Sequence, residues 1–324
     1  MKVCIYGAGA IGGWIGSGLA QAGCSVSVVA RGATLDALQL HGLRMKQGWQ
    51  VTSQAVASSA LPAELGVQDL VVLAVKTPSL PEVVRQIAPL LGTETIVLTA
   101  MNGVPWWFLQ SFGGALAGTR LTSIDPGGAL AEALPVRRII GCVVHASCSA
   151  PEPGLVQHHF GNKLIVGEPT GEKTPRLQQL AALLEKAGFE TEVSAQIQQD
   201  IWFKLWGNMT VNPISALTGA TTDRIMDDQL VRGFISSVML EAKEIGARIG
   251  IPIDQQPEDR HQITRKLGAF KTSMLQDVEA GKAVELDALV GSVRELGQLT
   301  GVATPFTDAL LGLARLHARV HGLY

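Results

Sequence analysis

The sequence opens with Met1-Lys-Val-Cys-Ile-Tyr-Gly7-Ala8-Gly9-Ala10-Ile11-Gly12, and this stretch predicts the fold. Lys2 to Tyr6 is typical of a short buried strand, and Gly12 to Ala22 is typical of a helix. A Gly-x-Gly-x-x-Gly pattern between a strand and a helix predicts a loop that binds a dinucleotide. The first glycine permits a tight turn, the second lets backbone N–H groups approach the pyrophosphate, and the third allows close helix–strand packing. The alternative is a glycine-rich turn that binds nothing.

Outward from this loop, predicted strands and helices alternate along the first part of the chain. They are strands at Ser25–Ala30, Asp69–Val75 and Thr95–Thr99 and a helix at Leu80–Leu91. The alternation predicts a Rossmann-type, doubly wound α/β domain, in which helices cover both faces of a parallel sheet. Further strand-like segments lie on either side of the turn Pro151-Glu-Pro-Gly154, at Gly141–Ser147 and Leu164–Gly167.

The second half of the chain has helical periodicity from about Ala195 onward. Apolar residues form one stripe at Ile235, Val238, Ala242, Ile245 and Ile249, and a second stripe runs from Leu286 to Leu296. Thr304-Pro305 predicts a helix start, with threonine as the N-cap. We therefore expect a nucleotide-binding, Rossmann-like domain at residues 1–194 and an all-helical domain at residues 195–324.

The composition argues against several classes of protein. The 324 residues suffice for two domains, and 26 basic against 28 acidic residues leave a formal net charge of −2, so no nucleic-acid partner is indicated. The glycine pattern is not a signal peptide, and no long stretch lacks polar residues, so we expect a cytoplasmic protein without a membrane partner. The four cysteines lack metal-binding spacing, and His158-His159 lacks the i, i+4 spacing of a metal site, so no metal is expected.

The end of the second predicted strand indicates which dinucleotide binds. NAD enzymes place an acid there, roughly 20 residues past the loop, to bind the ribose 2′-hydroxyl. This chain has Val28-Val29-Ala30-Arg31 and no acid. Because the guanidinium of Arg31 can pair with a 2′-phosphate, NADP(H) is favoured. The alternative is that Arg31 is a solvated surface residue.

Polar residues also follow the third and fourth predicted strands. Lys76 comes after Ala74-Val75, and Asn102 comes after Ala100-Met101. The carboxyl ends of parallel strands are where α/β sheets bind ligands, so both residues are candidates for contact with the cofactor. Each could equally be an ordinary polar residue at a strand end.

The most informative segment of the helical half is Ile201-Trp-Phe-Lys204-Leu-Trp-Gly-Asn208-Met-Thr-Val-Asn212-Pro213. Lys204, Asn208 and Asn212 are spaced i, i+4, i+8, which places them on one face of a helix that is otherwise apolar and therefore buried. A buried lysine needs a counter-charge or a ligand, and burial lowers the pKa of a lysine toward the range in which it donates a proton at neutral pH. Asparagine amides beside it can bind a polar substrate. The alternative is a lysine reaching solvent, with two asparagines in a helix-end turn.

Two further residues are less informative by themselves. Ser273 lies in Lys271-Thr-Ser273-Met-Leu-Gln-Asp277, and Glu285 lies in Val284-Glu285-Leu-Asp287. Both bracket a polar turn between predicted helices. From the residues alone they would be interpreted as capping or solvated side chains.

Taken in order, these motifs resemble those of the ketopantoate reductase (2-dehydropantoate 2-reductase) family over essentially the whole chain. The resemblance implies cofactor contacts from the glycine loop, Arg31, Lys76, Asn102, Glu285 and, more loosely, Ala150. It implies that Lys204 is the proton donor and that Asn102, Asn208, Asn212 and Ser273 bind the substrate. The implied reaction is NADPH-dependent reduction of ketopantoate in pantothenate biosynthesis, in a cleft between the domains.

One residue departs from the family pattern. Thr222, in Gly219-Ala-Thr-Thr222-Asp223, stands where the family can have another substrate-facing asparagine. The departure leaves the reaction class intact and the identity of the oxo acid open, so a reductase of another oxo acid is the alternative. A non-catalytic NADP-binding redox regulator is the other alternative, although a sensor need not keep a proton donor. The apolar helical half is compatible with a homodimer and with a monomer.

Overall fold

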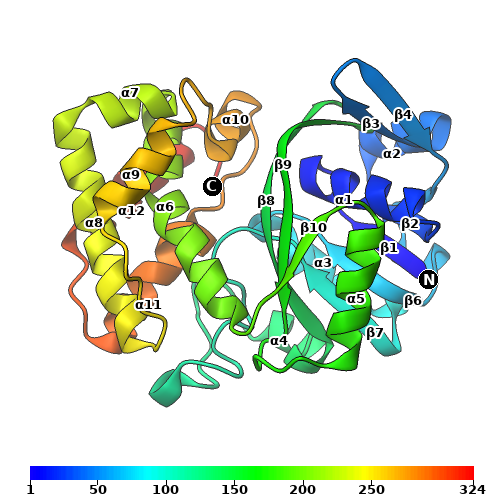
Figure 1. Ribbon diagram of the computed structural model, residues 1–324, viewed down its shortest axis with the longest axis horizontal. Helices are drawn as coiled ribbons and strands as arrows, with labels where there is room; N and C mark the ends of the chain where they lie inside the picture. Colours follow the sequence, from blue (N-terminus) through cyan, green and yellow to red (C-terminus); the bar gives the residue numbers. More distant parts are fainter. The chain divides into compact units, whose positions relative to one another are not determined.

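The computed structural model describes all 324 residues, Met1–Tyr324, and its contacts divide the chain into two compact units (Figure 1). The first unit consists of residues 1–101 and 128–197. The second consists of residues 102–127 and 198–324, so a segment from the middle of the sequence joins the C-terminal helices. No helix in either unit combines the length and the hydrophobicity that a membrane crossing requires.

The first unit is built on a mixed sheet of ten strands. Six of them, in the order β5-β2-β1-β6-β7-β8, are parallel to their neighbours, and the sheet then continues through the antiparallel pair β8–β9 to β3 and β4. The predicted doubly wound fold is confirmed. The strands are β1 (Lys2–Tyr6), β2 (Ser25–Val29), β3 (Leu43–Gln47), β4 (Gln50–Gln54), β5 (Ala57–Ser59), β6 (Gln68–Leu73), β7 (Leu91–Thr99), β8 (Ile139–Glu152), β9 (Leu155–Gly167) and β10 (Glu190–Val193).

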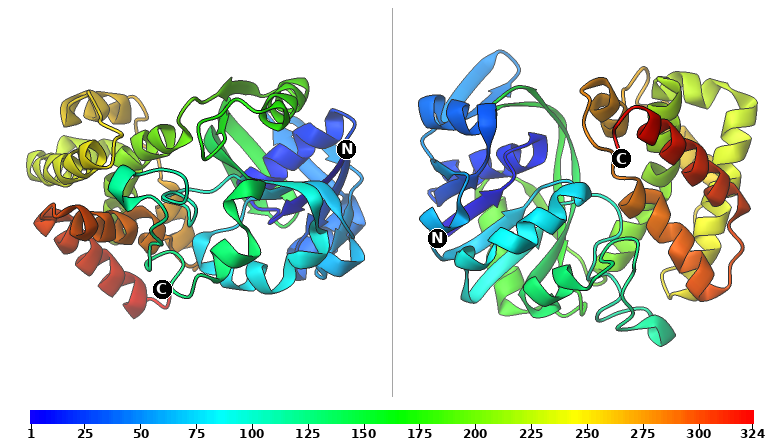
Figure 2. Two further views of the ribbon diagram at one scale, coloured as in Figure 1. Left: turned by 90° about the horizontal axis from the view of Figure 1, so that it is seen from below. Right: turned by 180° about the vertical axis from the view of Figure 1, so that it is seen from behind.

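Helices cover this sheet on both faces (Figures 1 and 2). Alternate strand residues such as Val3, Val28 and Val72 form one core with Ile15 of α1 and Leu180 of α5. Because successive strand residues point to opposite faces, the intervening apolar residues form the core on the other face, where α3 lies. The helices of this unit are α1 (Ala10–Gln21), α2 (Gly32–His41), α3 (Leu80–Gln86), α4 (Ala129–Ala133) and α5 (Pro175–Lys186).

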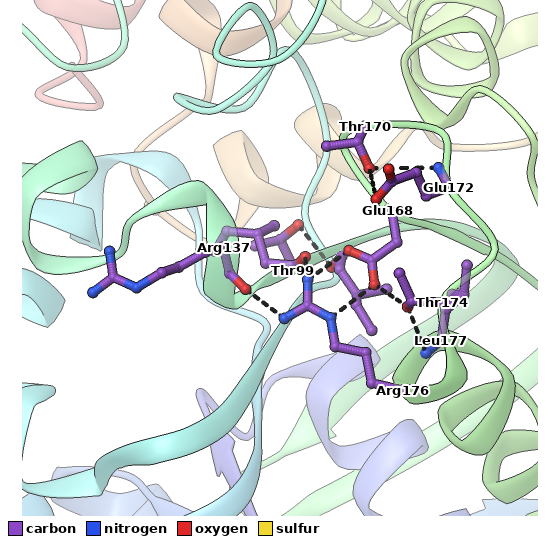
Figure 3. A network of polar contacts seen from close by, with 10 residues as sticks. Thr99, Arg137, Glu168, Thr170, Glu172, Thr174, Arg176 and Leu177 are labelled. Atoms are coloured by element: carbon purple, nitrogen blue, oxygen red, sulfur yellow. Dashed lines mark hydrogen bonds and ion pairs between the residues drawn. The ribbon is translucent and has the colours of Figure 1, made fainter.

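A buried carboxylate joins the start of α5 to the sheet (Figure 3). Glu168 is only 3% exposed, and its carboxylate accepts hydrogen bonds from Arg176 Nε at 2.7 Å and from Thr174 Oγ1 at 2.5 Å. Thr174 in turn caps α5 by accepting from the Leu177 N–H. Arg176 also donates to the carbonyls of Arg137 and Ile139. The charge is thus fully hydrogen-bonded, which a buried carboxylate requires.

The second unit is helical apart from residues 102–127. The predicted stripe on α8 is confirmed, since Ile235, Val238 and Ile245 are fully buried. Trp206 of α6 donates from Nε1 to the Met239 carbonyl of α8 at 2.7 Å, which joins the two longest helices. The helices are α6 (Ile197–Thr218), α7 (Thr222–Asp227), α8 (Gln229–Arg248), α9 (Pro257–Arg265), α10 (Ser273–Glu279), α11 (Ser292–Thr300) and α12 (Pro305–Val320), and a π-helical turn, η6 (Asp287–Gly291), precedes α11.

The structure differs from the sequence-based expectation in a few elements. The hairpin β3–β4 and the short strand β5 were not predicted. The residues of β4 are largely exposed, β5 has only three residues, and the apolar alternation of β3 is limited to Leu43 and Met45. The predicted helix at 80–91 ends at Gln86, where a 3₁₀ turn leads into a longer β7. The strand predicted at 69–75 ends at Leu73, which places Lys76 in the loop beyond it.

Candidate active site

The glycine loop combines a tight turn with close packing of helix α1. Gly7 has φ +99°, and a Cβ there would lie 2.7 Å from the side chain of Val75. A Cβ on Gly12 would lie 2.0 Å from the Gly7 carbonyl oxygen, so the helix packs directly on the loop. At Gly9, the N-cap of α1, a Cβ would meet nothing within 4 Å, and the first turn of α1 contains no acid. The N-terminus of α1 is therefore open to an anion, and these residues fit a dinucleotide.

Arg31 lies at the end of β2, as the N-cap residue of α2. Its side chain is 62% exposed and forms an ion pair with Glu82, in the first turn of α3. This pairing raises the pKa of Arg31 and lowers the pKa of the Glu82 carboxyl. The partner was not predicted, because a glutamate in the first turn of a helix is ordinarily explained by the helix dipole.

The other two cofactor candidates of the first unit occupy different places. Lys76 is half-buried in the loop after β6, where its carbonyl accepts from the Ser79 N–H at 2.9 Å. Ala150 is exposed in the outer part of the β8–β9 hairpin. That part of β9 packs against α1, since a Cβ on Gly13 would lie 2.4 Å from the Val156 side chain. Ala150 itself lies on β8, and its contact with a cofactor stays a prediction.

The segment with the lysine and two asparagines forms one continuous helix, α6. The helix runs through Pro213 to Thr218, so Asn212 does not lie in a helix-end turn. Asn212 is 7% exposed, whereas Lys204 and Asn208 are half-buried. The amides of Asn208 and Asn212 make no side-chain hydrogen bond within the protein. Polar groups in this setting are normally satisfied, so the two amides are available for a ligand.

Lys204 and Asn102 meet in the second unit, although they are far apart in the sequence. The ammonium group of Lys204 donates to Asn102 Oδ1 at 2.9 Å. Both residues are half-buried, so the hydrogen bond is partly shielded from water. The sequence indicated each residue separately as a candidate for the site, and the structure shows that the two are hydrogen-bonded to each other.

The backbone beside Asn102 is held against the π-helical turn. Val104 donates its N–H to the Ala288 carbonyl at 2.9 Å, and a Cβ on Gly103, whose φ is +81°, would lie 2.5 Å from the same oxygen. Glycine at this position therefore allows the close approach. Glu285 is half-buried just before this turn, and its carbonyl accepts from the Leu289 N–H. Turns of the π type frequently occur at functional sites.

Ser273 directly follows the loop at residues 266–272, and Thr222 is hydrogen-bonded to that loop. Ser273 is exposed as the first residue of α10, behind the N-cap Thr272. Thr222 is only 1% exposed, and its hydroxyl donates to the Gly268 carbonyl at 2.6 Å and accepts from the Phe270 N–H at 3.3 Å. The hydroxyl of Thr222, the residue that replaces an asparagine of the family pattern, is therefore hydrogen-bonded to the loop that leads to α10.

No cluster of three or more His, Cys, Asp or Glu side chains has the arrangement of a metal site. His158 stacks on Trp14 and contacts the Gly161 carbonyl through Nε2, and His159 contacts Ser149 Oγ. All four cysteines are free thiols. Burial raises the pKa of the Cys4 thiol to about 12, which makes it a poor nucleophile.

Comparison with known proteins shows the family to which this chain is similar. The family model "Ketopantoate reductase PanE/ApbA" matches residues 3–106, and "Ketopantoate reductase PanE/ApbA C terminal" matches residues 196–318. The 2-dehydropantoate 2-reductase of Mesorhizobium japonicum is 46% identical over 325 residues, covering 100% of both chains. The chain belongs to the ketopantoate reductase family.

Solved structures agree with this membership. A protein of Ralstonia solanacearum MolK2 assigned as a ketopantoate reductase is 54% identical and superposes with a TM-score of 0.96, covering 100% of this chain and 99% of that one. A D-mandelate dehydrogenase bound to NADH and anilino(oxo)acetate shares the fold at 21% identity, with a TM-score of 0.85 over 100% of both chains. The ketopantoate reductase family consists of oxidoreductases, and this chain is one of them.

Proposed function

We propose that this protein reduces a 2-oxo acid with NADPH, and that its substrate is 2-dehydropantoate, which is reduced to pantoate. The hydrogen bond between Lys204 and Asn102 carries the proposal, because it joins an ammonium group that can donate a proton to a polar side chain that can orient a carbonyl. Two unpaired amides lie further along the same helix, at Asn208 and Asn212. The similarity to 2-dehydropantoate 2-reductases over the full chain supports the choice of substrate.

The residues of α6 and residue 102 would perform the chemistry as follows. Bound NADPH would supply a hydride to the carbonyl carbon of the substrate. Lys204, oriented by Asn102, would donate a proton to the carbonyl oxygen as negative charge develops there, and would then be reprotonated from solvent. Asn208 and Asn212 would hold the polar groups of the substrate in register with the lysine. Ser273 is proposed to bind the carboxylate and Glu285 to contact the cofactor ribose or Lys204.

The preference for NADPH over NADH rests on the end of β2. Arg31 is the second residue after that strand, and the strand ends without the acid that would bind a 2′-hydroxyl. The open N-terminus of α1 at Gly9 would receive the pyrophosphate. Lys76 would lie beside the nicotinamide end.

NADPH oxidation, followed by absorbance, tests the proposal with a panel of oxo acids. The panel holds 2-dehydropantoate, smaller and larger 2-oxo acids, and a 3-oxo acid. We expect the highest kcat/KM with 2-dehydropantoate. A higher value with another oxo acid would reassign the substrate, which is a real alternative because Thr222 is used within the protein. NADPH binding without oxidation by any oxo acid would contradict the reductase proposal and favour a regulator.

We also propose that the protein forms a homodimer through helix α12. Phe306, Leu313, Leu316 and Val320 are between 45% and 73% exposed and, with Ala309, follow a heptad spacing on one side of the helix. Leu310, Ala314 and Ala318 are buried on another side. An exposed apolar stripe with this heptad spacing fits a second copy of the same helix.

A further inference from the structure

Glu82 lies where a cofactor phosphate is proposed to bind. Its carboxylate forms an ion pair with Arg31, which lies 51 positions earlier in the sequence. The Glu82 side chain is 32% exposed and that of Arg31 is 62% exposed, so both remain accessible to solvent. An incoming phosphate that uses Arg31 must therefore share this guanidinium with a carboxylate or displace it.

The order of the strands explains why these two side chains meet. β1 lies between β2 and β6, and the parallel strands end at the same edge of the sheet. Arg31 follows β2 and Glu82 belongs to the helix after β6. Both therefore approach the end of β1, at Tyr6, which directly precedes the glycine loop.

The electrostatic surroundings of Tyr6 show that the Arg31–Glu82 pair lies near the glycine loop. It is 7% exposed, and burial raises the pKa of its hydroxyl. The negative charge of Glu82 raises this pKa further, while the positive charge of Arg31 opposes it. The carboxylate is thus electrostatically coupled to the last residue of β1, next to Gly7.

We infer that Glu82 is a cofactor-specificity residue that weakens the preference for NADPH over NADH. The inference rests on the proposed function, in which Arg31 binds the 2′-phosphate. That phosphate carries close to two negative charges, so Glu82 repels it and competes with it for Arg31. The 2′-hydroxyl of NADH is neutral and can donate a hydrogen bond to a carboxylate, which is how acids at this edge of the sheet bind NAD.

Cofactor dissociation constants test the inference without the need for turnover. Binding of NADPH and of NADH is measured by isothermal titration calorimetry for the wild type, Glu82→Gln, Arg31→Ala and the double variant. Glu185→Gln makes the same charge change on α5, which carries none of the proposed cofactor residues, and is the matched control. Thermal melting confirms that each variant is folded.

We expect Glu82→Gln to tighten NADPH binding about threefold to fivefold, which is the scale of one exposed charge interaction. The affinity for NADH stays the same or weakens. The gain for NADPH decreases at high salt, because exposed charges are screened, and it is smaller in the Arg31→Ala background. Glu185→Gln changes neither dissociation constant.

Two results separate failure of this inference from failure of the proposed function. Suppose that Arg31→Ala weakens NADPH binding. If Glu82→Gln then leaves the preference for NADPH, measured as the NADH dissociation constant divided by the NADPH dissociation constant, unchanged or lowers it, the inference about Glu82 is wrong. If Arg31→Ala binds NADPH as tightly as the wild type, Arg31 does not select the cofactor, and the proposed NADPH preference fails together with the inference.

Discussion

Lys204 is the residue at which the proposed chemistry can be tested most directly. Replacing it by alanine removes the proton donor that Asn102 orients, while all of the glycine loop is left in place. We expect kcat to fall by about 10²–10⁴-fold, the range for loss of a general acid, with an NADPH dissociation constant within about twofold of the wild type. Steady-state kinetics and calorimetry measure the two quantities.

Lys266→Ala is the matched control, because Lys266 is an exposed lysine of the same unit, at the C-cap of α9. It should have wild-type kcat and KM. Turnover by Lys204→Ala at the wild-type rate would rule out the assigned proton donor.

The candidate site could be predicted residue by residue but not as a set of contacts. The i, i+4, i+8 spacing indicated one helical face for Lys204 and its asparagines, and α6 has that face. That Asn102 would meet Lys204 depends on the path of residues 102–127, which no local pattern encodes. Glu82 was missed because its partner is 51 positions away. The hydroxyl of Thr222 is used by a loop 46 positions further along.

At the scale of the elements, helix α11 binds the segment 102–127 through the carboxylate of Glu295. Glu295 accepts from the Thr122 N–H at 2.7 Å and from its hydroxyl at 2.8 Å, and from the Ser123 N–H at 2.8 Å. Burial raises the pKa of Glu295, but the hydrogen bonds from Ser123 and Thr122 outweigh it and hold this pKa below its usual value. The ionised form is therefore the one that the fold stabilises.

We expect Glu295→Gln to lower the free energy of unfolding by about 1–2 kcal/mol at pH 7, because the charge-assisted hydrogen bonds become neutral ones. A carboxyl whose pKa is lowered by folding contributes its full stability above the unfolded pKa, about 4.3, and loses it as the pH falls through the folded value. The difference between wild type and variant should thus shrink below about pH 4.

Urea unfolding of both proteins at pH 7 and at pH 3.5 measures this difference. Glu185→Gln, at an exposed position of α5, should cost little at either pH. A gap between Glu295→Gln and wild type that stays constant with pH would contradict the assignment of the effect to ionised Glu295.

Elements were predictable where burial dictates the sequence pattern. β1, β2 and β6 are apolar because both faces of the sheet are covered, and the predicted β1 matches the observed bounds. The β3–β4 hairpin is set by pairing of β3 with β9, more than a hundred residues later, and the side chains of β4 are mostly exposed. Its sequence therefore carries little signal.

At the scale of the whole molecule, the exposed stripe of α12 makes a prediction about assembly. Replacing Leu313 and Leu316 by lysine places two like charges in the proposed interface. We expect a homodimer of the wild type to become a monomer, with the mass measured by light scattering after size-exclusion chromatography. Leu40→Lys, at a 76% exposed leucine of α2, should leave the mass unchanged. A wild type that is monomeric at micromolar concentration would exclude the proposed dimer.

The membership of residues 102–127 in the second unit has a consequence for how the protein is made. On the ribosome this segment emerges before residues 128–197, which complete the sheet, and long before the helices that it belongs with. Phe108, which is fully buried in the finished protein, lacks its contact with Trp202 until α6 has been synthesised, and exposed aromatic surface of this kind favours aggregation. A gene divided after residue 194 would produce a first fragment in which Phe108 permanently lacks Trp202, and such a fragment should aggregate unless the second fragment is translated alongside it.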